Sequence, residues 1–314
     1  MSCRPKPCVV ACWGLFLGIA LTTVDAALTA TCGQAADLVV DNVNGSDYQN
    51  DRGLLTTPPT FGPYRTITRA LAAAGPGDRI VLTKTDQPYR ECISLHGFDH
   101  SGTATEPFTI VGNGATLDGS EPANPIGWRP HPRVPGLWEY LRTPPGAGLL
   151  LLAEQPLQQV RAANGPVQLA DLKPLQWTRQ NGQFYLCTAV DRGPRDYPLQ
   201  VTVQTTGITL YDVQHVVIEN LTVRGFRLDG INAHDRASEV RLKNVTTIEN
   251  GRSGVSVGGA SRVRLEASAS KGNGVAQLRT EGRSQLTLQN VTADATTAPA
   301  IDRDGGRVIG QPQP

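Results

Sequence analysis

Residues 216–222 (VVIENLT) recur as VRLKNVT at 240–246, as VRLEASA at 263–269 and as LTLQNVT at 286–292. Apolar and polar residues alternate within each copy, which is the periodicity of a β-strand and not of a helix. The copies lie roughly 23 residues apart, a period typical of solenoids whose coils stack at about 4.8 Å. One coil cannot bury its apolar face alone, so the pattern predicts one interior row formed by Val216, Val240, Val263 and Leu286.

A second short strand opens each coil, at residues 208–210, 231–233, 255–257 and 278–280. Between the two strands of a coil, Asn220, Asn244 and Asn290 share one position, which Ala267 occupies in the remaining copy. Asn tolerates left-handed backbone dihedrals and can hydrogen-bond to the next coil, so we favour an internal Asn stack. The same residues, with Asn44, also fit the N-x-[ST] glycosylation pattern, which is the alternative.

The first part of the chain combines short strands with one helix. Residues 64–72 have the pattern of a short amphipathic helix, which the Gly-Pro-Gly sequence at 75–77 ends. Strands are predicted at residues 37–40, 79–83, 92–95, 108–111 and 116–118.

A series of short motifs runs through this part: NGSD at 44–47, PYRTI at 63–67, AGPGD at 74–78, YRE at 89–91, SGT at 101–103, PFTI at 107–110 and LDGS at 117–120. Their order resembles the N-terminal cap and first coils of secreted right-handed parallel β-helix proteins of the pectin-lyase-like superfamily. The resemblance covers about residues 38–120 by these motifs and 207–310 by the coil pattern. It implies an all-β, right-handed parallel β-helix with an N-terminal capping helix, and a carbohydrate-related role.

Residues 121–206 separate these two regions and show no period near 23 residues. Strand-like segments at 136–140 and 182–186 indicate an inserted β-rich segment, and irregular coils of the main solenoid are the alternative. We therefore divide the chain into a signal peptide (1–26), the cap and first coils (27–120), the inserted segment (121–206) and the remaining β-helix coils (207–314).

Residues 1–26 have the composition of a secretory signal peptide, because Arg4 and Lys6 precede an apolar run at 8–21 and small residues stand at 24 and 26. The run is shorter than the ~20 residues that span a bilayer. We expect a secreted, periplasmic or cell-surface protein with no membrane contact after signal removal. The sequence carries no signal of an oligomeric state.

The charge balance argues against nucleic acid as a partner. Lys and Arg total 29 and Asp and Glu total 28, and the net charge is zero once residues 1–26 are removed. A general nucleic-acid binder would carry a basic excess.

Three cysteines, Cys32, Cys92 and Cys187, remain after signal removal, and an odd number cannot all pair within one chain. One reading is a disulfide between Cys32 and Cys92 in an oxidising compartment. The other is that Cys92 and Cys187 are small buried hydrophobic residues.

Strand alternation places the outward side chains of the coil-opening strands in two columns. One column holds Thr209, Asn232, Ser256 and Arg279, and the next holds Tyr211, His234, Gly258 and Glu281. Enzymes of the superfamily that cut polysaccharides use this face as a groove, so the resemblance directs the search to it. A sugar groove needs an aromatic face, short polar residues and a few charges for proton transfer.

The candidate catalytic residues are His234, Glu281, Asp229 and Asp235, and the candidate substrate-binding residues are Tyr211, Asn232 and Arg279. Elimination from a uronic acid needs a cation that neutralises the carboxylate and a base, roles that suit Arg279 and His234. Glycoside hydrolysis needs two carboxyl groups about 5 to 10 Å apart, which Asp229, Asp235 and Glu281 can supply. The chain carries neither the paired Asp residues nor the Gly-His-Gly motif of polygalacturonases.

Metal binding has weaker support. His96, Asp99 and His100 have a ligand-like spacing, but the glycines at 97 and 102 make this segment a loop. Asp41, Asp47 and Asp51 can bind Ca²⁺ in the loop near residues 42–53, although polar turn formation is the interpretation we favour. We assign no metal ligand, and Ca²⁺ is the one cofactor left open.

The outward column of the second sheet places opposite charges on neighbouring coils and is predicted to be a solvated face, with Glu219, Lys243, Glu266 and Gln289 as its members. Exposed pairs of this kind stabilise stacking by a few tenths of a kcal/mol each.

Two functions follow as hypotheses. The first is an enzyme that cleaves an extracellular polysaccharide by a lyase-like or glycosidase-like reaction. The alternative is a non-catalytic β-helix that binds glycans or serves as a structural surface protein. A polysaccharide or glycan is the expected partner in either case.

Overall fold

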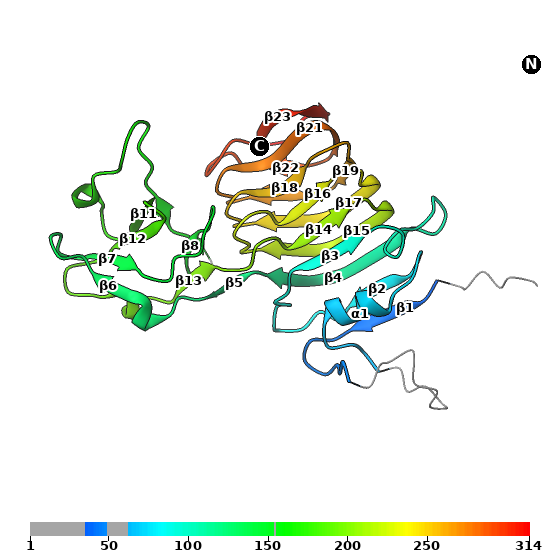
Figure 1. Ribbon diagram of the computed structural model, residues 1–314, viewed down its shortest axis with the longest axis horizontal. Helices are drawn as coiled ribbons and strands as arrows, with labels where there is room; N and C mark the ends of the chain where they lie inside the picture. Colours follow the sequence, from blue (N-terminus) through cyan, green and yellow to red (C-terminus); the bar gives the residue numbers. More distant parts are fainter. Residues whose placement is uncertain (1–34, 49–61, 154) are drawn as a thin grey trace, which may run out of the picture. The chain divides into compact units, whose positions relative to one another are not determined.

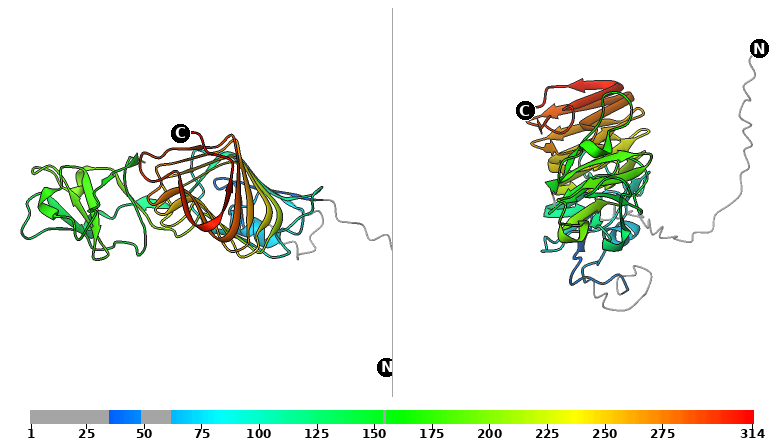
Figure 2. Two further views of the ribbon diagram at one scale, coloured as in Figure 1. Left: turned by 90° about the horizontal axis from the view of Figure 1, so that it is seen from above. Right: turned by 90° about the vertical axis from the view of Figure 1, so that its left-hand side faces the viewer.

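The structure is a computed structural model that describes residues 35–48, 62–153 and 155–314. The predicted signal peptide, Cys32 and Asp51 lie outside the described residues. A curled parallel sheet runs through successive coils, and Figures 1 and 2 show these coils stacked on one another.

The strands of this sheet are β1 (Asp37–Val40), β2 (Arg79–Leu82), β3 (Ile93–His96), β4 (Phe108–Asp118), β14 (Ile208–Tyr211), β15 (Gln214–Arg224), β16 (Ile231–His234), β17 (Ser238–Ile248), β18 (Ser253–Val257), β19 (Arg262–Glu266), β20 (Ala269–Lys271), β21 (Ala276–Gln289), β22 (Thr292–Ala293) and β23 (Ile301–Ile309). One face follows the order β1-β2-β4-β15-β17-β19-β21, and the coil-opening face follows β3-β14-β16-β18-β21. The parallel solenoid predicted from the repeat is therefore confirmed.

The predicted interior row is present. Val216 pairs with Val240, Val240 with Val263, and Val263 with Leu286, all in parallel register. Each of the four side chains is at most 3% exposed, so every coil contributes one apolar residue to the same row of the core. Apolar burial along such rows is the main force that holds the coils together.

The left-handed turn predicted at the Asn positions is confirmed, and one bond of the predicted stack is present, although the side chains of Asn244 and Asn290 are exposed. Asn220, Asn244 and Asn290 all have positive φ, at 55°, 50° and 53°. The side-chain amide of Asn244 donates to Oδ1 of Asn220 at 2.7 Å. Ala267, with φ of 45°, adopts the same left-handed turn without an amide, so the turn geometry continues where the stack is interrupted.

A second row of amides lies inside the coils and is not predicted from the sequence. Asn273 Oδ1 accepts hydrogen bonds from both the main-chain N and Nδ2 of Asn250, each at 3.0 Å. Nδ2 of Asn273 donates to Gln277 Oε1 at 2.7 Å. All three side chains are fully buried, so these bonds satisfy polar groups that water cannot reach.

The capping helix is α1 (Ile67–Ala73), which begins three residues later than predicted. Thr66 is its N-cap, and its hydroxyl accepts from Arg69 N at 3.1 Å. The carboxylate of Glu91 accepts from the main-chain N–H groups of Ile67 and Thr68, each at 2.9 Å. These bonds satisfy N–H groups that have no partner within the first turn of a helix.

The chain leaves the coils after Asp118 and forms two further sheets before it returns at Ile208 (Figure 1). Their strands are β5 (Ser120–Pro122), β6 (Trp128–Pro130), β7 (Leu137–Tyr140), β8 (Leu150–Leu152), β9 (Gln155–Pro156), β10 (Gln158–Gln159), β11 (Gln176–Gln180), β12 (Gln183–Cys187) and β13 (Leu199–Thr202). Short 3₁₀ turns lie at Pro125–Gly127, Leu169–Asp171 and Pro194–Asp196. Trp128, Tyr140, Trp177 and Phe184 belong to a separate hydrophobic core of this excursion.

Two strands each join segments that were predicted separately. Residues 108–111 and 116–118 belong to the single strand β4, because the chain bends at Asn113 with φ of 53° and keeps its pairing with β15 on both sides of the bend. β21 likewise contains both the predicted opening strand at 278–280 and the first residues of the repeat copy at 286–292. Among the described residues, no helix has the length and apolar character needed to cross a membrane.

Candidate functional site

The outward side chains of the coil-opening face stand in the two predicted columns. In the first column Thr209 pairs with Asn232, Asn232 with Ser256, and Ser256 with Arg279. Two members of the columns are not exposed as expected, because Ser256 is only 3% exposed and Gly258, in the second column, is buried. Ser256 lies between the longer side chains of Asn232 and Arg279 in its column.

The second column contains a slot at Gly258. Tyr211 and His234 are partners in register on β14 and β16. A Cβ atom placed on Gly258 would lie 4.0 Å from the His234 Cβ and 3.7 Å from Glu281 Oε2. Gly258 therefore separates His234 from Glu281, and the slot between them has the width of a methyl group, because a Cβ there would make ordinary van der Waals contacts with both.

An aromatic pair and a carboxylate border one side of this slot. The rings of Tyr211 and His234 meet edge to face with centroids 5.0 Å apart. His234 Nδ1 lies 3.7 Å from Asp235 Oδ1, and half of the Asp235 side chain is exposed. A hydrogen bond to the Asp235 carboxylate raises the pKa of Tyr211, since the negative charge favours the neutral phenol.

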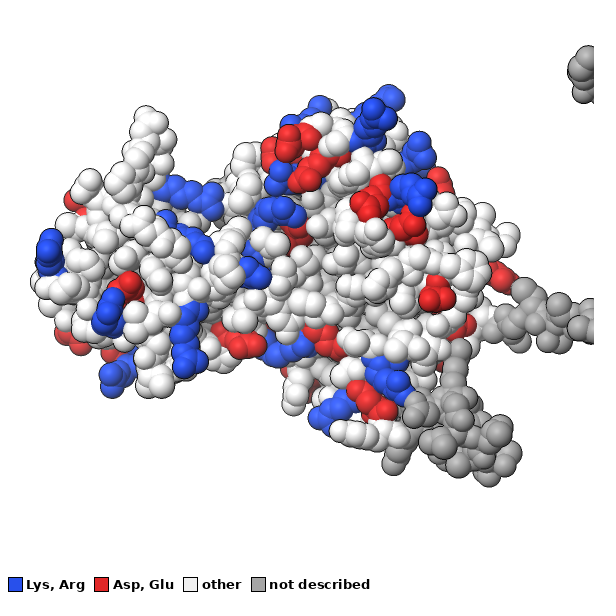
Figure 3. Space-filling view, viewed as in Figure 1, with Lys and Arg blue, Asp and Glu red and all other residues white. Residues whose placement is uncertain are grey.

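Arg279 is enclosed by carboxylates. Its Nε lies 2.9 Å from Glu281 Oε1 and 3.5 Å from Asp302 Oδ2, and its Nη2 lies 3.4 Å from Asp304 Oδ2. Only 18% of the Arg279 side chain is exposed. Figure 3 shows acidic and basic side chains side by side over the upper coils. The guanidinium charge is therefore already compensated within the protein.

Asp229 lies inside the protein and not on the outward face. It is fully buried, and Arg252 Nε donates to its Oδ1 at 2.9 Å. Ser253 Oγ donates to the same oxygen at 2.6 Å, and Asn232 Nδ2 donates to Oδ2 at 3.4 Å. The bond to Asp229 raises the pKa of Arg252. Asp229 thus joins neighbouring coils, and its oxygens have no access to a substrate on the surface.

The residues considered for metal binding have other partners. His100 Nδ1 accepts from the main-chain N of His96 at 3.1 Å, and burial lowers the pKa of His100. Asp41 accepts from the main-chain N–H groups of a turn, and Asp47 caps the turn that precedes α1. In the described part of the chain, no three His, Cys, Asp or Glu side chains are grouped so that they could hold a metal ion.

The two described cysteines, Cys92 and Cys187, differ in their exposure, so the interpretation as small buried hydrophobic residues is considered for each of them. Cys92 is an exposed free thiol whose Sγ donates to Gln204 Oε1 at 3.5 Å. That interpretation is wrong for Cys92 because the next residue, Ile93, points into the core and strand alternation turns Cys92 outward. Cys187 is half-buried, and desolvation raises the pKa of its thiol.

Comparison with known proteins agrees with this geometry. Residues 200–309 match the family model for the right-handed beta helix region. The coils of the chain form a right-handed parallel β-helix. A solved structure of a glycoside hydrolase is similar to this β-helix with a TM-score of 0.51 and 11% identity, over 82% of this chain and 74% of that chain. The complex of XylC with xylose has a TM-score of 0.40 and 11% identity, over 87% of this chain and 68% of that one. No curated protein sequence shows a significant match.

Two acidic residues of the β-helix site were not among the sequence candidates. Asp302 pairs in register with Arg279, and Asp304 pairs with Glu281, both from β23. One more shift of about 23 residues from Leu278 reaches Ile301, so extending the repeat by one coil finds them. His96 also joins the column, since it pairs in register with Tyr211.

Proposed function

We propose that this β-helix is a carbohydrate-active protein that hydrolyses a glycosidic bond in an uncharged glycan at the slot over Gly258. The observation that carries the choice of reaction and substrate is the enclosure of Arg279 by three carboxylates. Elimination from a uronic acid requires a free cation to neutralise the uronate. Arg279 is the residue expected to supply this cation, but its positive charge is already paired with the three carboxylates.

The charge of this end of the face also disfavours an acidic substrate. One guanidinium faces three carboxylates, those of Glu281, Asp302 and Asp304. The cluster then carries net negative charge and repels a uronate carboxylate. A neutral sugar experiences no such repulsion and can use the same oxygens as hydrogen-bond acceptors for its hydroxyl groups.

Two exposed carboxylates flank the slot. Glu281 borders Gly258, and its side chain is 37% exposed. The Asp235 carboxylate lies beside His234, with Oδ1 3.7 Å from His234 Nδ1, and half of its side chain is exposed. In glycoside hydrolysis one carboxyl protonates the leaving oxygen, and the other acts as a nucleophile or activates water. We assign these two roles to Glu281 and Asp235 as a pair.

The remaining residues of the face suit sugar binding. The edge-to-face pair of Tyr211 and His234 offers an apolar ring surface beside the slot, and Tyr211 is 44% exposed. Asn232 and Thr209 supply short polar groups in the neighbouring column. The shared fold with a glycoside hydrolase is consistent with this function, but at 11% identity it supports the fold alone.

The test is to incubate the purified protein with a panel of neutral glycans and polyuronates, with and without Ca²⁺. New reducing ends report hydrolysis, and unsaturated products report elimination. Glu281→Gln and Asp235→Asn are each expected to lower turnover of a neutral glycan about 10²- to 10⁴-fold, the usual contribution of a general acid or base. Glu106→Gln, an exposed carboxylate on another loop, is the matched control and keeps wild-type turnover.

Unsaturated products from a polyuronate would overturn the choice of reaction. Full activity of both variants would remove the residue assignment. Glycan binding without any turnover would favour the non-catalytic alternative.

A further inference from the structure

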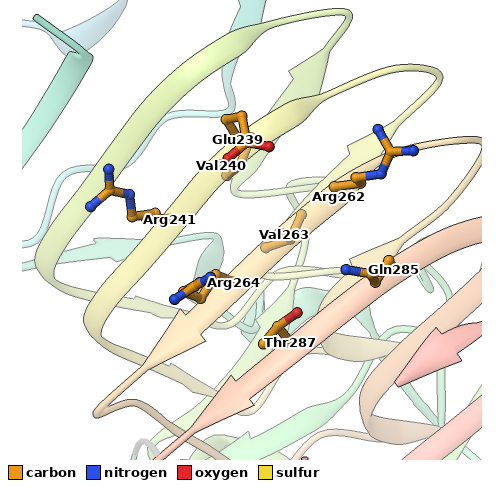
Figure 4. Close-up of a pocket in the computed structure, with 8 residues that line it drawn as sticks. All are labelled: Glu239, Val240, Arg241, Arg262, Val263, Arg264, Gln285 and Thr287. Atoms are coloured by element: carbon orange, nitrogen blue, oxygen red, sulfur yellow. The ribbon is translucent and has the colours of Figure 1, made fainter. Parts of the chain in front are cut away.

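A groove of about 360 Å³ lies on the outward face of the other sheet, over β17, β19 and β21 (Figure 4). Arg241, Arg262 and Arg264 line it, with Gln285 and Thr287 on the next strand. The groove uses the second strand of each coil, whereas the slot over Gly258 uses the first. The two are therefore separate surfaces of the protein.

The arginines of the groove are poorly compensated. Arg241 and Arg264 are partners in register on neighbouring parallel strands, an arrangement of like charges that costs stability. Arg264 Nε lies 3.8 Å from Glu266 Oε1. Within the described ranges, the side chains of Arg241 and Arg262 form no ion pair and no hydrogen bond. Glu239 also lines the groove but forms no ion pair with any of the three arginines among the described residues.

This arrangement contrasts with the other arginines that stack between coils. Arg252 pairs with the buried Asp229, Arg236 with Asp212, and Arg279 with its three carboxylates. At each of those positions a carboxylate of the protein itself pairs with the arginine. In the groove no carboxylate of the described residues pairs with Arg241 or Arg262, and Figure 4 shows the three arginines spread across the strands, with Gln285 and Thr287 on the strand beside Arg262 and Arg264.

We infer that this groove binds an anionic polysaccharide, whose sulfate or carboxylate groups pair with Arg241, Arg262 and Arg264. A guanidinium offers a planar fork of donors that matches both kinds of oxyanion. Arg241 and Arg264 recur at the coil spacing of about 4.8 Å, which suits charges repeated along a polymer. The Gln285 amide and the Thr287 hydroxyl can bond to the sugar hydroxyls between those charges.

Other polyanions fit less well. Single-stranded nucleic acid needs aromatic side chains on which bases stack, and none of the described residues that line the groove is aromatic. An extended acidic peptide is commonly bound at a free sheet edge or by apolar pockets. Here β17 and β19 are each paired on both sides. A hydroxylated, charged polymer is the class that remains.

Binding is measured by titrating the full-length mature protein with dextran sulfate and with polygalacturonate, which separate sulfate from carboxylate as the recognised group. Neutral dextran, single-stranded DNA and polyglutamate are the comparison probes. The variant Arg241→Gln/Arg262→Gln/Arg264→Gln is expected to weaken binding about tenfold or more, since three exposed charge pairs are lost. Tenfold corresponds to about 1.4 kcal/mol. Added salt is also expected to weaken binding by wild type, because it screens the charges of the arginines and of the polysaccharide.

The control variant Arg133→Gln/Arg142→Gln/Arg195→Gln removes the same charge from exposed positions of the excursion and is expected to bind like wild type. Arg241→Glu serves as a second groove variant with a single change. Glu281→Gln is expected to keep anion binding, and the groove variants are expected to keep turnover of a neutral glycan, so this inference and the proposed function fail independently.

The inference is supported if wild type binds dextran sulfate or polygalacturonate and the groove variants lose that binding. The polysaccharide that binds then identifies sulfate or carboxylate as the recognised group. The inference is overturned if neither polysaccharide binds, if the groove variants bind as tightly as wild type, or if DNA or polyglutamate binds equally well.

Discussion

Replacing Asn273 with Ala tests whether the buried amide row holds the coils together. The change removes the acceptor for the main-chain N–H of Asn250, a bond of 3.0 Å, and the donor to Gln277 Oε1 at 2.7 Å. Nδ2 of Asn250 keeps a bond to Val223 O at 3.3 Å, so two buried groups lose their principal partner. At ~1–3 kcal/mol for each unsatisfied group, and with partial relaxation, we expect a loss of about 2–4 kcal/mol in the free energy of unfolding.

Thermal and urea unfolding followed by far-UV circular dichroism measure this loss. At about 2–4 °C for each kcal/mol, the melting temperature of Asn273→Ala falls by roughly 5–15 °C. Asn290→Ala is the matched control, because Ala267 already occupies the equivalent turn on the neighbouring coil and the Asn290 side chain is exposed. Its cost is expected to stay within about 1 kcal/mol. Equal losses in the two variants, or none in Asn273→Ala, would refute the reasoning.

Two further predictions concern other parts of the chain. Burial raises the pKa of Tyr89 from 10.0 to about 12, so its neutral form stabilises the folded state fully below pH 10, and this contribution is lost as the pH rises toward 12. The melting temperature of wild type should therefore fall more steeply between pH 9 and pH 11 than that of Tyr89→Phe. Melting temperatures that fall in parallel in the two proteins would contradict this. Gly258→Leu fills the slot between His234 and Glu281 and is expected to abolish glycan turnover, with the melting temperature measured alongside because Gly258 is buried. Gly258→Ala, whose nearest new contact is 3.7 Å, is expected to keep most of the activity, and full activity of Gly258→Leu would show that the substrate lies elsewhere.

The fold was predictable because it depends on alternation alone. Val216, Val240 and Val263 occupy equivalent positions in successive copies, and a shift of one residue would turn each of them into solvent. The hydrophobic pattern therefore fixes the register without knowledge of any distance. The same argument predicted the outward columns, since Tyr211 and His234 follow from the inward positions of their own strands.

The chemistry of the site was less accessible because it depends on contacts between coils. Asp229 is a turn residue by sequence, and only the position of Arg252 on the next coil shows that its carboxylate is buried and paired. The surroundings of Arg279 come from β23, where Gly305 and Gly306 interrupt the alternation that identifies the other strands. Local periodicity predicts which side of a sheet a residue faces but not which charge it meets there.

The place where the excursion leaves the coils has consequences for how this protein can change over evolution. Ser120 and Thr202 are Cα partners in antiparallel pairing, and the main-chain N–H groups of Val203 and Gln204 both donate to Gly119 O at 3.0 Å. Departure and return are thus neighbours, and a tight turn is long enough to join them. A shorter segment can therefore join Gly119 to Val203 without a change in the register of the coils, at the loss of contacts such as the hydrogen bond from Arg161 Nη2 to Gly274 O at 2.9 Å.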